Sequence, residues 1–237
     1  MAENGRLPDS DLAPTQVGGE LRNDAAASVN RMALAFYLDM DFRLLARSTY
    51  RTYAEQVTTK QKYGSFAAEP GTSNHGWGKA VDFASGIPDD DSAAHRWMER
   101  NAGAYGWENP LWARNASTAD GQYEPWHWEF DPSNDRKKGA PYLHKPDTGE
   151  IGLGSSGTRA REVQALLNKN LQPENHVRVD GDFGWASAAA VVKFQQSRGL
   201  AVSGVVGPVT LARLRGDSDT DSNSDVPIYL QQGTQKV

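Results

Sequence analysis

The chain contains no cysteine, which excludes disulfide bonds and thiolate metal sites. A metal ion bound by this protein would therefore be held by imidazole and carboxylate groups. Long hydrophobic runs are also missing. The most apolar stretch runs from Met32 to Leu38, which falls far short of the ~20 residues that span a bilayer. Charged residues close it at both ends, at Arg31 and Asp39, so we interpret it as a helix of the protein core.

The N-terminus has little that a targeting signal needs. Its opening sequence, MAENGRLPDSDLAPT, has neither a basic start nor an apolar stretch, so we expect no secretory signal peptide. The composition, 38% apolar and 23% charged, is ordinary for a soluble globular protein. A length of 237 residues allows one large domain, or a medium domain with a small one.

Charge is unevenly distributed behind the net value of −5. Residues 1–145 carry 16 Lys+Arg against 20 Asp+Glu, a balance of −4, whereas residues 158–215 carry 8 against 4, a balance of +4. The basic segment suits an anionic partner, although a solvated surface would look the same. The chain is acidic overall and lacks a dense basic stripe, so the sequence does not support a role with nucleic acid.

Two changes in composition divide the chain. Residues 145–157, within KPDTGEIGLGSSGT, are rich in glycine and serine, and we interpret them as a linker. Residues 216–237 begin with a Ser/Asp tract too polar to bury, so we predict an acidic, disordered tail. The expected organisation is a catalytic domain over residues 1–144, the linker, a small module over residues 158–215, and the tail.

The small module has a helical rhythm. Apolar residues recur at helical spacing after TRARE, at Val163, Leu166, Leu167 and Leu171. A second helix, SAAAVVKFQQSR, would end before Gly199, and a third would begin at Pro208 in GPVTLARL. The pattern predicts three short helices around one core.

A resemblance covers nearly the whole module. VDGDFG, the FQ pair of the second helix, the GL pair after it and GVVGP together resemble the peptidoglycan-binding domain found at the ends of many cell-wall hydrolases. The resemblance implies that peptidoglycan is the partner of this protein. A three-helix spacer is the alternative interpretation.

The N-terminal domain has two stretches that could form a metal site, SNHGWGKAVDF and YEPWHWEF. A catalytic zinc site uses three protein ligands and leaves the fourth position for water. His75, Asp82 and His127 could supply these ligands. A further group must move the proton of the water, and Glu124 is the natural candidate.

Strand periodicity supports this grouping. KAVDF and WHWEF both alternate like strands, so Asp82 would lie on the face opposite Val81 and Phe83, and His127 on the face opposite the tryptophans. Two adjacent strands could therefore present Asp82 and His127 to a common cleft. Glu124 lies three residues before His127, so in a continuous strand it would have the wrong parity and point to the opposite face. Pro125, however, begins a strand more naturally than it continues one. A bend at Glu124–Pro125 could then bring the carboxylate to the metal. Glu129 has the right parity and is the second choice for the base.

The joint pattern Ser73-x-His75-x-x-Gly78-x-Ala80-x-Asp82, followed by Glu124-x-Trp126-His127, is more specific than its parts. It resembles the signature of the zinc D-Ala-D-Ala carboxypeptidase and L-alanyl-D-glutamate endopeptidase (VanY-like) family. The resemblance implies an α+β fold, an antiparallel sheet with flanking helices as in zinc D,D-peptidases and Hedgehog-like domains.

The family's site residues transfer to this sequence position by position. The resemblance implies that His75, Asp82 and His127 hold one zinc ion in the catalytic domain. It also implies that Glu124 is the general base for a zinc-activated water. STYRTYAEQ resembles a third family segment, in which the arginine corresponds to Arg51.

The remaining candidates have weaker support. Arg51 would stabilise an oxyanion or hold a substrate carboxylate, although a surface salt bridge is the alternative. Gln56, Ser73 and Trp126 are candidates for substrate binding or for support of a metal ligand. His95 lies in a helix-like run and is expected to be structural. His144 and His176 lie in no motif and receive no role.

These expectations combine into one function, a zinc metallopeptidase that hydrolyses an amide bond in the stem peptide of peptidoglycan. Without an export signal, such an enzyme resembles a bacteriophage endolysin that accumulates in the host cytoplasm before it reaches the wall. We expect a monomer with no membrane insertion. The alternatives are a bacterial D-Ala-D-Ala carboxypeptidase and a non-catalytic wall-binding phage protein.

Overall fold

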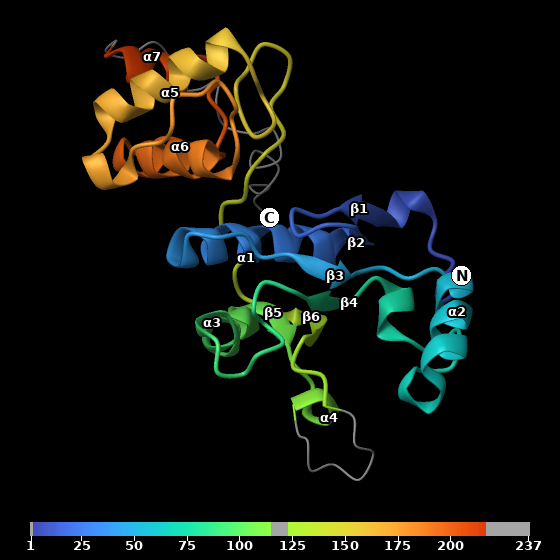
Figure 1. Cartoon of the computed structure of the whole chain (residues 1–237). Coiled ribbons are helices and arrows are strands. Elements are labelled where there is room, and N and C mark those ends of the chain that lie inside the picture. The colour runs from blue at the N-terminus through green and yellow to red at the C-terminus, as the bar shows by residue number, and fades with distance from the viewer. Residues whose placement is uncertain (1, 115–122, 217–237) are drawn as a thin grey trace, which may run out of the picture. The chain divides into compact units, whose positions relative to one another are not determined.

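The computed structural model describes residues 2–114 and 123–216. Two compact units make up the chain, residues 1–140 and residues 141–237 (Figure 1). Within the described ranges, none of the helices combines the length and the hydrophobicity needed to cross a bilayer.

The first unit is built on a four-stranded antiparallel sheet with the strand order β3-β4-β6-β5. Its strands are β3 (Ala46–Ser48), β4 (Ala80–Phe83), β5 (Tyr105–Glu108) and β6 (His127–Asp135). A separate hairpin pairs β1 (Leu12–Pro14) with β2 (Glu20–Arg22). The predicted α+β fold with an antiparallel sheet is confirmed.

Helices flank this sheet. They are α1 (Asn23–Met40), α2 (Tyr53–Tyr63), α3 (Ala93–Asn101) and α4 (Leu111–Arg114), with 3-10 turns η1 (Asp9–Asp11), η2 (Gly64–Phe66), η3 (Asn74–Trp77) and η4 (Ala102–Ala104). The apolar stretch predicted to be a core helix lies inside α1, where Met32, Leu34 and Phe36 are buried. α1 contacts both β5 and β6 (Figure 1). Each such side chain contributes about 1.5–3 kcal/mol by leaving water.

The pairing of β4 with β6 places the polar residues of both strands on one face. Asp82 lies directly opposite His127, and Val81 lies opposite Trp128. Val81 and Trp128 are buried in the core, so the two polar side chains point the other way. The predicted alternation of these strands is confirmed.

A buried ion pair fixes α1 to the end of β6. Arg31 Nη2 lies 2.6 Å from Asp135 Oδ2, and the two side chains are only 8% and 3% exposed. The sequence offered no signal for this pair, because its partners are 104 residues apart.

Asp135→Asn is expected to destabilise the first unit by about 3–5 kcal/mol, because it leaves the Arg31 charge buried without its partner. Urea unfolding followed by tryptophan fluorescence would measure this loss. Glu3→Ala is the control, since it breaks the exposed Arg6–Glu3 pair, which is expected to matter little. Equal midpoints for Asp135→Asn and the wild type would contradict the prediction.

In residues 141–216, the described part of the second unit, three helices surround one core as predicted. They are α5 (Thr158–Asn170), α6 (Trp185–Ser197) and α7 (Pro208–Arg215), with the short turn η5 (Pro173–Asn175). Pro208 is the first residue of α7, and Gly199 has a left-handed φ of 66° just after α6. Gln164 and Gln195 are buried between the helices and hydrogen-bond the loops around them.

The stretch 145–157, for which the composition predicts a linker, lies within the second unit. Ile151 is buried and forms a β-bridge with Val206, and Ser156 forms another with Asp182. This stretch therefore packs on the helical module despite its glycine and serine content. The predicted disordered tail, apart from its first residue, lies outside the described residues.

Candidate active site

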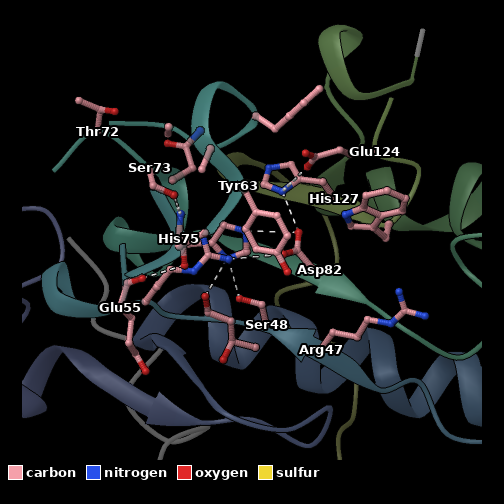
Figure 2. A pocket seen from close by; sticks show the side chains of 18 of the residues that line it. Arg47, Ser48, Glu55, Tyr63, Thr72, Ser73, His75, Asp82, Glu124 and His127 are labelled. Carbon is pink, nitrogen blue, oxygen red and sulfur yellow. Dashed lines mark hydrogen bonds and ion pairs between the residues drawn. The ribbon is translucent and has the colours of Figure 1, made fainter. Parts of the chain in front are cut away.

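Three side chains converge where β4, β6 and η3 meet. His75 comes from η3, Asp82 from β4 and His127 from β6, and one ligand atom of each lies within 4.8 Å of the others. Asp82 Oδ1 lies 3.3 Å from His75 Nε2 and 3.0 Å from His127 Nδ1. Figure 2 shows these side chains pointing toward one another, with Glu124 beside them. The structure brings together the three residues predicted to be metal ligands.

The orientation of His75 is fixed from its other side. Its Nδ1 lies 2.7 Å from the carbonyl oxygen of Thr49. Because a carbonyl only accepts, Nδ1 must donate, which leaves the lone pair of Nε2 facing Asp82. Ser73 caps η3, its hydroxyl accepting the backbone N–H of His75 at 3.3 Å. Ser73 thus contacts the backbone of the predicted ligand His75.

Glycines in the SNHGWGKAVDF segment allow this close packing. Gly78 has a φ of 62°, and its N–H donates to the carbonyl of His75 at 3.0 Å. A Cβ at Gly78 would lie 2.6 Å from the backbone nitrogen of Arg22, and one at Gly76 would clash with the side chain of Asn4. Both positions need glycine because other segments of the chain lie against the loop.

Glu124 reaches the cluster through a tight turn. The N–H of His127 donates to the carbonyl of Glu124 at 2.9 Å, and Glu124 Oε2 lies 4.0 Å from His127 Nδ1. The predicted bend at Glu124–Pro125 is therefore present. Burial raises the pKa of Glu124, opposed by the positive charges of His127 and Arg51. A raised pKa suits a carboxylate that must take up and release a proton.

Asn109 anchors the turn that carries Glu124, and sequence reasoning missed it. Its buried side chain donates to the carbonyl of His127 at 2.7 Å and to that of Glu124 at 3.1 Å. Asn109 lies between motifs in the sequence and has no local pattern that points to this role.

Arg51 lies beside the cluster, as predicted. Its Nη2 donates to Ser48 Oγ at 2.9 Å and lies 3.6 Å from Asp82 Oδ2. The guanidinium lines the cleft, where it is placed to meet negative charge. The surface salt bridge considered for Arg51 is instead a partly buried contact with a predicted metal ligand.

Gln56 is part of the support beneath the site. It is 2% exposed, its amide nitrogen donates to Asn4 Oδ1 and to the carbonyl of Arg51, and its oxygen accepts the N–H of Gly71. Asn4 in turn donates to the carbonyl of Ser73 at 2.7 Å. These bonds use the polar atoms of Gln56 for positioning, which fits the supporting role and not the substrate-binding role considered for it.

A cleft of about 1420 Å³ runs over the cluster. The residues that line it include the aromatic side chains of Tyr50, Tyr63, Phe66, Trp112, Tyr123 and Trp126. The ring of Trp112 lies 5.0 Å from that of His127, centroid to centroid. Trp126 was predicted to contact substrate, whereas Trp112 lies between the two motif stretches, where no pattern marked it as a site residue.

The electrostatics of the cluster favour a bound cation. Burial alone would lower the pKa of His127, but hydrogen bonds to Asp82 and Glu129 outweigh it and raise this pKa to about 9. Burial would raise the pKa of Asp82, yet its contacts with His127 and His75 hold this pKa well below its usual range. The cluster thus stabilises positive charge. Two imidazole nitrogens and one carboxylate oxygen in this setting fit the donor set of a catalytic zinc site.

The other histidines lie outside this cluster. His95 is buried and its Nδ1 bonds the carbonyl of Ile87 at 2.7 Å, consistent with the structural role expected for it. His176 Nε2 lies 3.2 Å from the carbonyl of Leu171, and the ring of His144 lies 4.5 Å from that of Tyr142.

Comparison with known families places both units. Residues 18–133 match the D-alanyl-D-alanine carboxypeptidase family, VanY, and residues 156–214 match the peptidoglycan binding domain family. The first unit carries a VanY-type carboxypeptidase domain. His75, Asp82, Glu124 and His127 all lie within the matched range.

Individual relatives are more distant. The zinc D-Ala-D-Ala carboxypeptidase of Streptomyces albus G is 35% identical over 74 residues, which are 31% of this chain and 29% of that protein. The chain therefore aligns with less than a third of this curated relative. The LdcB LD-carboxypeptidase is 26% identical, covering 56% of this chain and 72% of that chain with a TM-score of 0.44. A Zn(II) complex of the vancomycin-resistance D,D-pentapeptidase VanY is 21% identical, covering 52% and 82% with a TM-score of 0.43.

Proposed function

We propose that the chain is a zinc peptidase that hydrolyses an amide bond in the stem peptide of bacterial peptidoglycan. The observation that carries the proposal is the convergence of His75, Asp82 and His127, with Glu124 Oε2 only 4.0 Å from His127 Nδ1. Bound zinc would supply a Lewis acid for the scissile carbonyl and lower the pKa of water toward ~7. The chain's own residues would do the rest of the work.

Glu124 is proposed as the general base and then the general acid. Its carboxylate takes one proton as the water oxygen bonds to the carbonyl carbon, and negative charge then builds on the carbonyl oxygen. Arg51 stabilises that charge from the cleft wall. When the C–N bond breaks, Glu124 returns the proton to the amine nitrogen, so that the carboxylate is regenerated for the next cycle.

The second unit supports the choice of substrate. A peptidoglycan-binding domain tethered to the peptidase raises the effective concentration of stem peptide without adding a catalytic contact. The balance of +4 over residues 158–215 suits an anionic wall. We therefore infer that the second unit delivers the first to its substrate.

A D,D-carboxypeptidase that trims the terminal D-Ala is the second candidate. It is favoured by the family match over residues 18–133, whose description names that reaction. The first candidate is an endolysin, as expected from the sequence. An endolysin would instead cleave within the stem or its cross-links, and it would accumulate in a host cytoplasm before release. The two candidates share every catalytic residue named above and differ only in the bond that is cut.

Mass spectrometry of purified peptidoglycan digested by the zinc-loaded wild type would test the proposal. New stem-peptide termini from an internal bond, with lysis of cells treated from outside, would support an endolysin. Release of single D-Ala with intact walls would support the carboxypeptidase. Binding to walls of several species without any cleavage product would overturn both and favour a wall-binding protein.

A further inference from the structure

Glu129 lies against the side of His127 that faces away from the other predicted ligands. Its Oε1 is 3.0 Å from His127 Nε2, while His127 Nδ1 is 3.0 Å from Asp82 Oδ1. The Glu129 side chain is 24% exposed and the imidazole 7% exposed. Glu129 also accepts a hydrogen bond from the side chain of Asn74. The carboxylate is therefore held in place between two elements, β6 and η3.

This contact matches the tautomer of His127 that metal binding through Nδ1 would require. A neutral imidazole has one N–H and one lone pair, and an ionised carboxylate can only accept. Asp82 lies equally close to Nδ1, so the metal-free imidazole can donate to both carboxylates. A metal ion bound at Nδ1 would leave the one hydrogen of the neutral imidazole on Nε2, where the carboxylate of Glu129 accepts it. Carboxylates that bond the outer nitrogen of a metal-bound histidine orient the ring and raise its basicity.

The two histidines are oriented by different means. His75 uses the backbone carbonyl of Thr49, which no substitution removes. His127 depends on the side chain of Glu129. Because Asn74 immediately precedes His75 in η3, the Glu129–Asn74 bond also ties the element that carries one histidine to the strand that carries the other.

We propose that Glu129 is a positioning residue that holds the predicted zinc ligand His127 in the tautomer and orientation needed to bind metal. This role replaces the one considered from strand parity, in which Glu129 was the second choice for the base. Glu124 approaches His127 Nδ1, whereas Glu129 approaches Nε2. The inference rests on the metal site of the proposed function, but its main measurement needs no substrate.

The test is the zinc affinity of Glu129→Ala, Glu129→Gln and the wild type, measured by competition with a chromogenic chelator at fixed pH. We expect affinity to fall about 10–100-fold in the alanine variant. The glutamine variant should recover part of this loss, because its amide oxygen can still accept the Nε2–H. Glu108→Ala is the matched control: Glu108 is exposed and pairs with Glu129 across β5 and β6, so wild-type affinity is expected.

Other results would overturn the proposal. Wild-type zinc affinity in Glu129→Ala would do so, as would equal losses in the alanine and glutamine variants. If zinc affinity is unchanged but turnover at saturating zinc falls about 10²–10⁴-fold, Glu129 is the base. The melting temperature of each metal-free variant separates these results from misfolding, and the glutamine variant decides if the alanine variant does not fold. A wild type that binds zinc but cleaves no stem peptide would overturn the proposed function and leave the affinity series to decide this inference.

Discussion

Glu124→Gln is expected to slow stem-peptide hydrolysis about 10²–10⁴-fold, the range over which a positioned general base contributes to a rate. The amide keeps the shape of the side chain but cannot take up the proton of the attacking water. Because Glu124 Oε2 is 4.0 Å from His127 Nδ1 and is not one of the three clustered ligand atoms, zinc affinity should stay close to that of the wild type. Initial rates at saturating zinc, with the zinc dissociation constant measured in parallel, would test both parts.

Glu108→Gln is the matched control for this variant, because it makes the same chemical change on an exposed position of the same sheet. It should retain wild-type rates. A Glu124→Gln enzyme with near wild-type turnover would exclude Glu124 as the base. Loss of rate together with loss of zinc would instead make Glu124 a participant in metal binding.

Asp82→Asn is expected to weaken zinc binding more than about 100-fold, beyond the 10–100-fold range of residues that only support ligands. Asp82 has this effect because its carboxylate is shared: Oδ1 contacts both histidines and Oδ2 faces Arg51. The neutral amide removes the negative charge at the centre of the cluster.

Thermal unfolding with and without zinc gives a direct measure of this change. A ligand present at 100 times its dissociation constant stabilises a protein by about 2.7 kcal/mol, so the melting temperature of the wild type should rise with zinc and return after chelation. Asp82→Asn should show no such rise, whereas the control Asp91→Asn, at an exposed position, should respond as the wild type does. An undiminished rise in Asp82→Asn would contradict its assignment as a ligand.

Much of the site could be predicted from the sequence because its geometry is local. Strand alternation put Asp82 and His127 on matching faces, and the proline after Glu124 marked the turn that carries the carboxylate to them. The helical spacing of the second unit was readable for the same reason. In each case the period of a regular element fixes where a side chain points.

The supporting contacts could not be predicted in this way. Asn109 bonds the turn of Glu124, Gln56 bonds Asn4 across 52 residues, and Arg31 pairs with Asp135 across 104. Such partners meet only when the whole unit has folded, and no period in the chain marks them. Glu129 shows the same limit. Strand parity correctly placed it on the same face as His127, but the contact with His127 Nε2, on which its proposed role rests, could not be predicted.

Because Asp82 pairs directly with His127 across β4 and β6, metal binding would depend on the correct register of these two strands. If the two strands slipped by one residue, every side chain of the slipped strand would move to the other face of the sheet, and His127 would enter the apolar core while Trp128 took its place in the cleft. A chain paired in that way would lack one of the three donors. Zinc would thus bind and stabilise only correctly registered molecules, and the fraction of a preparation that takes up metal would report the fraction that has paired its strands correctly.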